Sequence, residues 1–202
     1  MNILALIVSY LLGSISFGYL VTKSLKGIDI RTVGSGSTGA TNVGRVLGFK
    51  YAFLIFLLDT LKGLVVILLL SLLNYSDLFL LLCGIAVILG HNWPIYFKFK
   101  GGRGVATTLG VFLGIATIPA LIVFGIFLVI VGITRYVSLG SIIAAICVPV
   151  FAVILNYTWE YFLFGVIIAL IIVLRHTENI KRLSKGQEPK LGQKKREFQA
   201  ER

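Results

Sequence analysis

The chain has 202 residues, of which 57% are hydrophobic and 13% charged, and its mean hydropathy is +0.97. A soluble domain of this size cannot bury so much apolar surface, so composition argues against a soluble enzyme, a disordered chain or a disulfide scaffold and favours a membrane protein. The net charge of +11 is unusual for so apolar a chain, which makes the placement of its basic residues informative.

Apolar runs long enough to cross a bilayer, about 20 residues each, recur along the chain. The first run, 3–22, lacks a basic leader and a small-residue cleavage site, so we expect a retained span rather than a signal peptide. The stretch 105–134 is ambiguous. At about 1.5 Å per residue it would be about 45 Å long as a helix, too long for one span and short for two. Pro119 lies near its middle.

Basic residues decide how often 105–134 crosses, because Lys and Arg mark the cytoplasmic side. They occur in 23–50, in 98–103 and after Leu174, but not in the turns 74–77 and 156–158. Only two crossings of 105–134 place Arg135 and the tail on the same side as the earlier loops. We therefore predict an all-α, polytopic protein with seven transmembrane helices, an outside N-terminus and a cytoplasmic C-terminus. The predicted spans are 3–22, 51–73, 78–97, 105–117, 119–134, 137–155 and 159–174.

Residues 1–189 are predicted to form a single membrane domain, followed by a basic, disordered tail at 190–202. Within it, Ala106, Gly110 and Gly114 recur at a spacing that permits close helix packing. Asp59 and Lys62 lie three residues apart inside the second span, where ionisable groups are costly, so we expect them to pair and to support the site, together with His91.

The first cytoplasmic loop contains GSGSTGATNVGR at 34–45. A dinucleotide site would need a preceding strand, and a P-loop would need lysine where Ala40 stands. Glycine-rich backbone nevertheless forms concave nests that bind anions, and the Arg45 guanidinium suits phosphate. A flexible linker is the alternative, but a linker needs neither Asn42 nor Arg45. The predicted phosphate-binding residues here are Gly34, Gly36, Ser37, Gly39, Thr41 and Asn42.

The second block, HNWPIYFKFKGGRGVATT at 91–108, places basic residues around a glycine-rich turn that opens the next helix. Free N–H groups at a helix start also bind anions. A positive-inside loop with an aromatic belt would explain the lysines and aromatics but not the glycines. The predicted phosphate-binding residues are Lys98, Lys100, Gly101, Gly102, Arg103 and Gly104.

The third block follows the last span, as RHTENIKRL at 175–183 and then GQE at 186–188. A basic tail on anionic lipid is the alternative interpretation. His176 and Asn179 would share one face of a continuing helix. A histidine near two anion sites is a catalytic candidate, and Arg182 is a further phosphate ligand.

Taken together, 34–45, 90–108 and 176–188, with DTLKG at 59–63, resemble the bacterial acyl-phosphate:glycerol-3-phosphate acyltransferase family (PlsY type) over nearly the whole chain. The resemblance implies transfer of a fatty acyl group from acyl phosphate to the sn-1 hydroxyl of glycerol 3-phosphate. The products would be lysophosphatidic acid and phosphate, in the first acylation of phospholipid synthesis at the bacterial cytoplasmic (inner) membrane.

The resemblance also implies residue roles: Ser35 and Arg45 are essential, the second block binds glycerol 3-phosphate, His176 and Asn179 support activity, and Glu188 supports the structure. Two departures occur. Ser37 and Thr38 stand where the family usually has Asn-Pro, and Arg103 stands where it usually has lysine. Arginine keeps the charge and binds phosphate in a bidentate manner, so the role is retained.

The chemistry is compatible with direct attack by the acceptor hydroxyl, because acyl phosphate is already activated. Arg45, Ser35 and the nest would stabilise the leaving phosphate. Lys98, Lys100 and Arg103 would hold the acceptor phosphate, and the base is either His176 or that phosphate itself.

No acidic cluster suggests a metal, so we predict no metal and no cofactor. The predicted partners are the two substrates and membrane lipid, with no nucleic acid and no obligate protein partner, and with a functional link to the enzyme that makes acyl phosphate.

Two rival functions fit the sequence less well, and of these the transporter is kept as the alternative. A transporter of phosphate or organophosphate anions would distribute basic residues along a transmembrane path, whereas only Lys62 lies inside a span. A His-x4-Asp acyltransferase would need aspartate where Tyr96 follows His91 and where Lys181 follows His176.

Overall fold

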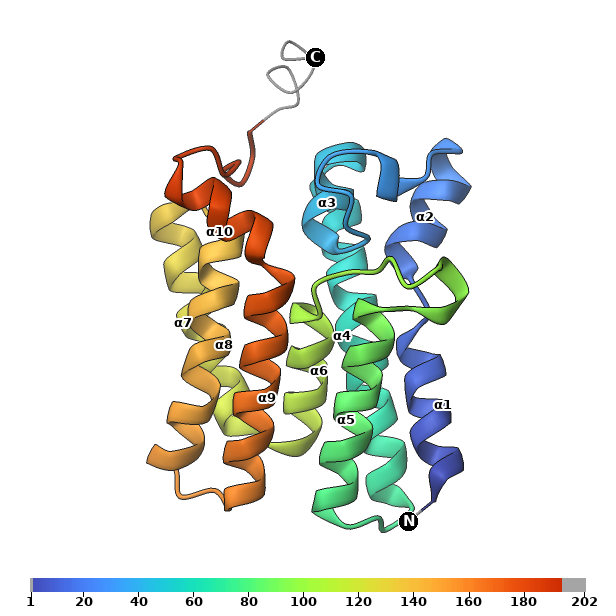
Figure 1. The fold of residues 1–202 in the computed structure, drawn as a ribbon, viewed down its shortest axis with the longest axis vertical. Coiled ribbons are helices and arrows are strands. Elements are labelled where there is room, and N and C mark those ends of the chain that lie inside the picture. The colour runs from blue at the N-terminus through green and yellow to red at the C-terminus, as the bar shows by residue number, and fades with distance from the viewer. Residues whose placement is uncertain (1, 194–202) are drawn as a thin grey trace.

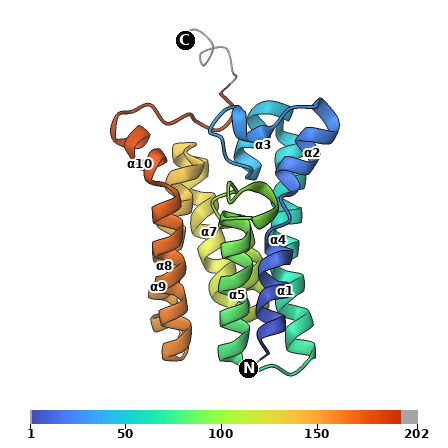
Figure 2. The same ribbon diagram turned by 45° about the vertical axis from the view of Figure 1, so that its right-hand side comes forward.

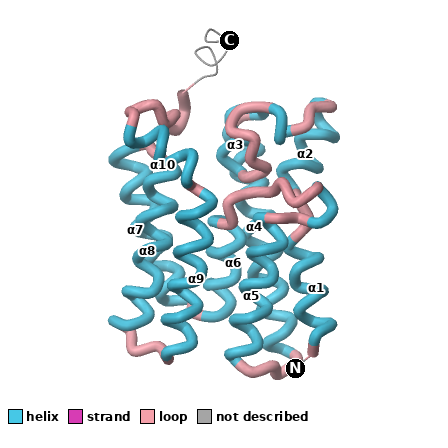
Figure 3. Tube along the Cα trace, viewed as in Figure 1, coloured by secondary structure: helices cyan, strands magenta, loops and turns pink. Residues whose placement is uncertain are grey.

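The computed structural model describes residues 2–193, and within them every regular element is a helix (Figure 3). Short 3₁₀ turns at Ile30–Thr32 and Ile95–Phe97 lie between the α-helices. The α-helices are α1 (Ile3–Gly13), α2 (Phe17–Lys26), α3 (Ala40–Leu47), α4 (Phe49–Leu72), α5 (Asp77–Asn92), α6 (Val105–Ile115), α7 (Thr117–Thr134), α8 (Val137–Ile154), α9 (Trp159–Arg175) and α10 (Thr177–Ser184).

Five helical segments are long and apolar enough to cross a membrane: Ile3–Lys26, α4, Asp77–Phe97, α7 and α8. The helix α9 qualifies only together with α10, and α6 is apolar but has 11 residues. An all-helical protein with several apolar spans is thus confirmed. The count of seven spans and the orientation of the termini stay predictions.

The helices lie side by side, with α2, α3 and α10 at one end of the bundle and the start of α1 at the other (Figure 1). The turns α4–α5 and α8–α9 lie at the end where α1 starts. The three polar blocks therefore share the opposite end, and Figure 2 shows the 93–104 loop beneath α2 and α3 there.

Close backbone packing joins α4 to α6. A Cβ on Gly110 would lie 1.9 Å from the Thr60 carbonyl oxygen, and one on Gly114 would lie 2.7 Å from the Ile67 side chain. The small-residue spacing was expected to allow this approach, and the prediction is confirmed. The second loop leads directly into α6, one member of this closely packed pair.

The predicted first span is not one continuous helix, because the chain breaks between α1 and α2 at residues 14–16. The Ser14 hydroxyl donates to the Tyr10 carbonyl at 2.9 Å. A side-chain hydrogen bond of this kind competes with the backbone hydrogen bonds that would continue the helix. The Lys62 ammonium donates to the Ile15 carbonyl, which lies within this break, at 2.9 Å. A side chain 47 residues away thus stabilises the break.

Of the later helices, one ends earlier than the apolar pattern predicts and one leads into a bend. The helix α5 stops at Asn92 instead of residue 97, because Pro94 disfavours helical geometry in the residue before it. The helix expected to continue from the last span through Asn179 is interrupted at His176, where α9 and α10 meet with a 61° bend.

The predicted tail, 190–202, is only partly visible in the structure. Residues 194–202 lie outside the described part of the chain. Among the residues before them, the Leu191 N–H donates to the Arg135 carbonyl at 2.7 Å, and the Arg135 guanidinium donates to the Leu191 carbonyl at 2.8 Å. The start of the tail is therefore held against the α7–α8 turn.

Candidate active site

The first loop is organised around the side chain of Asn42, which is 1% exposed. Its Oδ1 accepts from the Ser35 N–H at 2.9 Å, and its Nδ2 donates to the carbonyls of Val33 at 3.0 Å and Ser37 at 2.9 Å. The amide is thus fully used within its own loop. Asn42 was expected to bind phosphate, and the structure places it instead beneath the loop that presents Ser35.

Gly34 and Gly36 allow this loop to curl. Both adopt positive φ angles, of 62° and 68°, and a Cβ on Gly34 would lie 2.1 Å from Asn42 Oδ1. Gly39 then serves as the N-cap of α3. The predicted nest of Gly34, Gly36, Ser37, Gly39 and Thr41 therefore leads directly into a helix start, where backbone N–H groups favour anions.

Arg45 lies in the last turn of α3, on the side that faces the third block. Burial lowers the pKa of its guanidinium, Glu188 counteracts this shift, and Arg182 adds to it. Electrostatic coupling to Glu188 and Arg182 shows that α3 and the α10 region lie within range of one another, although about 140 residues separate them in sequence.

The second loop is held by two arginines, Arg175 of the third block and Arg31, which precedes the first block. Arg175, at the end of α9, donates to the Gly102 carbonyl from Nε at 3.1 Å and from a terminal nitrogen at 2.7 Å. Arg31 donates to the Phe97 carbonyl at 2.9 Å. Gly104, with a φ of 84°, ends the loop and caps α6. Neither Arg31 nor Arg175 was singled out from the sequence, where each looks like an ordinary positive-inside residue.

Only one of the three basic residues of the second loop reaches the interior of the site. Burial lowers the pKa of Arg103 to about 10, with Arg182, Arg45 and Arg175 adding to the shift and Glu188 opposing it. Lys98 and Lys100 are exposed and are not among the charges acting on Arg103. Of the predicted cations in this loop, the structure therefore brings Arg103 to the other blocks and leaves the lysines outside.

The third block converges on Glu188, whose side chain is 3% exposed. Its Oε1 accepts from Ser138 Oγ at 2.8 Å and from Asn179 Nδ2 at 2.7 Å, and its Oε2 accepts from Arg182 Nε at 2.7 Å. Burial raises the pKa of the Glu188 carboxyl, but the three hydrogen bonds hold it below its usual value. Ser138 was not predicted, because nothing in its local sequence distinguishes it from other span serines.

His176 lies at the bend between α9 and α10, and its side chain is buried. Its Nδ1 is 2.8 Å from the Ile172 carbonyl, which can only accept, so Nδ1 carries the proton and Nε2 is an acceptor. Burial, together with the charge of Arg103, lowers the pKa of His176 to about 4. The imidazole is therefore neutral at physiological pH.

The three blocks thus form one site, in which three arginines act on the carboxylate of Glu188: Arg182 binds it, and Arg45 and Arg103 lie within electrostatic range of it. We call these three residues the arginine cluster. A family model described as "Glycerol-3-phosphate acyltransferase" matches residues 3–186. The chain belongs to the glycerol-3-phosphate acyltransferase family. The function predicted from the sequence, an acyltransferase acting in glycerol 3-phosphate acylation, is confirmed at this level.

Named relatives and solved structures agree with this assignment. Glycerol-3-phosphate acyltransferases of Desulforamulus reducens and Prochlorococcus marinus (strain MIT 9312) are 44% and 46% identical, each covering 96% of this chain and 97% and 99% of their own. A crystal structure of an integral membrane glycerol 3-phosphate acyltransferase, PlsY, in its glycerol 3-phosphate form is 44% identical with a TM-score of 0.89, covering 94% of this chain and 95% of that one. The crystal structure of PlsY in its lysophosphatidic acid form is 43% identical with a TM-score of 0.86, and the match covers 94% of this chain and 95% of that one.

These comparisons support the acyltransferase interpretation and not the transporter alternative. Among the described residues, no group of three or more His, Cys, Asp or Glu side chains is arranged to hold a metal ion. The independence from metals and cofactors stays a prediction.

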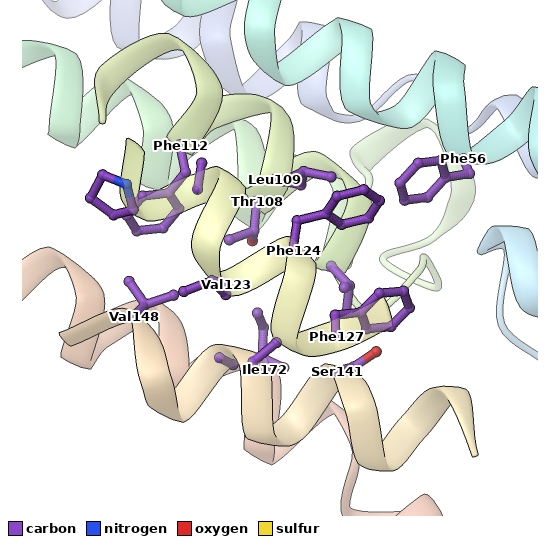
Figure 4. Close-up of a pocket in the computed structure, with 15 residues that line it drawn as sticks. Phe56, Thr108, Leu109, Phe112, Val123, Phe124, Phe127, Ser141, Val148 and Ile172 are labelled. Atoms are coloured by element: carbon purple, nitrogen blue, oxygen red, sulfur yellow. The ribbon is translucent and has the colours of Figure 1, made fainter. Parts of the chain in front are cut away.

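Directly below the polar site, this acyltransferase contains an apolar pocket between α4, α6, α7, α8 and α9 (Figure 4). Phe56, Phe112, Phe124 and Phe127 contribute rings to its wall. The pocket reaches Val105, which follows Gly104, and Ile172, whose carbonyl binds His176. Two residues of the pocket wall therefore adjoin residues of the polar site.

The predicted ion pair inside the second span is confirmed, with Lys62 Nζ 2.8 Å from Asp59 Oδ1. His91 joins it, since its Nδ1 lies 2.9 Å from Lys62 Nζ. These three residues, the ion triad, lie beneath the second loop and outside the arginine cluster.

Proposed function

We propose that this acyltransferase transfers a fatty acyl group from acyl phosphate to the sn-1 hydroxyl of glycerol 3-phosphate, with release of lysophosphatidic acid and inorganic phosphate. The observation that carries the proposal is the arginine cluster, which gathers cations from three separate blocks around one carboxylate. Desolvated guanidinium groups in such number are suited to a site that binds more than one phosphate. Both proposed substrates carry one.

The donor assignment is supported by the apolar pocket. Acyl phosphate joins a long apolar chain to a phosphate, and the pocket offers an apolar space whose wall includes Val105, next to Gly104, and Ile172, whose carbonyl binds His176. Its carbonyl is already activated by a good leaving group, so no covalent acyl-enzyme is required. The donor chain would lie in the pocket and its phosphate among the arginines.

In this arrangement the two phosphates occupy different blocks. Arg45, the 34–39 nest and Ser35 bind the leaving phosphate and the developing oxyanion. Arg103 and the N–H groups of Gly101 and Gly104 hold the acceptor phosphate, while Gly102, whose N–H donates to the His91 carbonyl, sets the path of the backbone between them. Lys98 and Lys100 stand at the exposed rim, where their charge raises the local concentration of anionic substrate.

We further propose seven crossings with the active site on the cytoplasmic side of the bacterial inner membrane. The start of α1 and the helix α10 lie at opposite ends of the bundle, as an odd number of crossings requires (Figure 1). All three basic blocks lie at the α10 end, in accord with the positive-inside rule. Glycerol 3-phosphate is soluble, so it would reach such a site from the cytoplasm.

A donor-exchange assay tests this function. Purified protein with acyl phosphate and labelled glycerol 3-phosphate should form labelled lysophosphatidic acid and phosphate without coenzyme A or a carrier protein. Acyl-coenzyme A in place of acyl phosphate, and glycerol in place of glycerol 3-phosphate, are the matched controls. Product from acyl-coenzyme A alone would refute the donor, and no product from any pair would refute the function.

The pH dependence of kcat/KM tests which group accepts the hydroxyl proton. Proton transfer to His176 would create an imidazolium beside Arg103, which its pKa of about 4 disfavours. Phosphate monoesters have a second pKa of about 6. We therefore propose the acceptor phosphate as the base, with His176 as a neutral acceptor that orients the hydroxyl. Since kcat/KM reports free enzyme and free substrate, it should fall as the pH drops through about 6.

Replacing His176 by glutamine is the matched measurement. The rate should fall, while the midpoint near pH 6 should not move. An acidic limb near pH 4 in the unmodified enzyme that vanishes in H176Q would assign the proton transfer to His176 instead.

A further inference from the structure

The ion triad is an unusual feature of the apolar interior of the bundle. Asp59 and Lys62 come from α4 and His91 from α5, and their side chains are 2%, 6% and 5% exposed. Replacing such a buried ionic group by well-packed apolar residues often stabilises a protein, so packing alone does not account for it. Ionisable groups inside a membrane span are costly, and they commonly take part in the function of the protein.

The hydrogen-bond donors and acceptors in the triad determine which ring nitrogen of His91 carries the proton. The Lys62 ammonium has three protons and no acceptor. Its three nearest partners are Asp59 Oδ1 at 2.8 Å, the Ile15 carbonyl at 2.9 Å and His91 Nδ1 at 2.9 Å. His91 Nδ1 is therefore the acceptor, and the imidazole proton lies on Nε2.

The opposite edge of the same ring faces the second loop. A Cβ on Gly102 would lie 2.0 Å from His91 Nε2, so the ring occupies the space of the missing side chain. The backbone of His91 holds the same segment, because its carbonyl accepts from the Gly102 N–H at 3.1 Å. A Cβ on Gly101 would lie 2.1 Å from that carbonyl oxygen. His91 thus sets the path of Gly101 and Gly102 from below.

We propose that Asp59, Lys62 and His91 are positioning residues for the acceptor site. Lys62, held by Asp59 and the Ile15 carbonyl, orients the His91 ring, and the ring places the Gly101–Gly102 backbone for the acceptor phosphate. This inference rests on the proposed function, in which that backbone binds glycerol 3-phosphate. It also explains why the second loop needs glycine at position 102.

A charge-neutral double variant tests the triad without leaving an unpaired buried charge. In Asp59→Asn/Lys62→Gln, the KM for glycerol 3-phosphate should rise about 10-fold or more, because the loop is misplaced. The KM for the donor should change less than about 2-fold, since the triad contacts the second loop and the α1–α2 break rather than the 34–45 loop. Lys26→Met, which removes an exposed lysine of α2, is the control and should leave both constants unchanged.

A purely structural role for the triad predicts a different result. It would reduce the amount of folded enzyme and kcat, or it would raise both KM values together. Either outcome, in protein that is monodisperse and helical, overturns the proposal. Unchanged constants in the double variant overturn it as well.

A second variant set remains decisive if the double variant does not fold. Gly102→Ala should raise the KM for glycerol 3-phosphate, because the new methyl group meets His91 Nε2. His91→Asn removes the atoms at that position and keeps an oxygen for Lys62. The combined variant should therefore have a lower KM than Gly102→Ala alone. Independent, additive effects would show that Gly102 does not act through His91 and would overturn the proposal.

Direct binding separates this inference from the proposed function. Titration calorimetry with glycerol 3-phosphate should show the same loss of affinity in Asp59→Asn/Lys62→Gln as the KM does, with no donor present. If the unmodified enzyme makes no lysophosphatidic acid yet binds glycerol 3-phosphate, only the proposed reaction fails. If the unmodified enzyme is active and the variant binds with unchanged affinity, only the positioning role fails.

Discussion

Replacing Arg45 by alanine should reduce kcat/KM for acyl transfer by about 10²- to 10³-fold, with the protein still folded. Arg45 is partly buried at the end of α3, and within residues 2–193 its guanidinium makes no hydrogen bond to another protein group. Its guanidinium is therefore available to bind phosphate, and its loss removes charge where the leaving phosphate gains it. Initial rates with acyl phosphate and glycerol 3-phosphate, measured on purified protein, check the result.

The lysine variant and a neighbouring control sharpen this test. Arg45→Lys should recover part of the rate, because the charge returns without the bidentate geometry. Lys50→Ala removes an exposed cation five residues along the chain and should leave the rate nearly unchanged. A near-normal rate for Arg45→Ala would remove Arg45 from the reaction centre.

Local apolar patterns predict most of the helices within a few residues. The predicted spans 51–73, 137–155 and 159–174 appear as Phe49–Leu72, Val137–Ile154 and Trp159–Arg175. Such runs are predictable because each span must satisfy its own backbone hydrogen bonds within the membrane. The gathering of basic blocks at one end was likewise predictable, since charge placement follows the membrane side.

Features that depend on distant partners were not predictable in the same way. The break at 14–16 depends on Lys62, and the bend at His176 accompanies the capture of Glu188 by Asn179, Arg182 and Ser138. No window of sequence contains both members of these contacts. Residue type alone also could not tell Arg103, which reaches the site, from Lys98 and Lys100, which do not.

Asn42 illustrates the same limit within a motif. Its amide was expected to bind substrate because it lies among glycines and hydroxyls. The structure uses that amide to hold the backbone of Val33, Ser35 and Ser37. A motif thus predicts where a site lies better than it predicts which of its residues contact the ligand.

Replacing Glu188 by alanine should lower the free energy of unfolding by about 3–5 kcal/mol. The carboxylate is the shared acceptor for Ser138, Asn179 and Arg182, so its loss leaves the Arg182 charge and the Asn179 amide without their partner. It also removes the negative charge that offsets Arg45 and Arg103. The thermal midpoint of the purified protein measures the effect, and acyl transfer should fall as α10 leaves the site.

Lowering the pH should remove the difference in thermal midpoint between the parent protein and Glu188→Ala. The folded-state pKa of Glu188 lies below its ordinary value of 4.5, so its contribution is complete above that pH and is lost as the pH falls through the folded-state pKa. The midpoints of the parent protein and of Glu188→Ala should therefore converge in acid and differ most near neutrality. A constant difference across this range would show that the ionised carboxylate is not what stabilises the fold.

Glu178 provides the matched control for Glu188. It is the same residue type, lies on α10 and pairs with Lys181 at 2.9 Å, but both side chains are 69% exposed. Solvent screens such a pair, so Glu178→Ala should leave the thermal midpoint and the rate nearly unchanged. Equal effects of the two substitutions would mean that loss of a carboxylate on this segment is enough, and that the buried contacts of Glu188 do not join the third block to the arginine cluster.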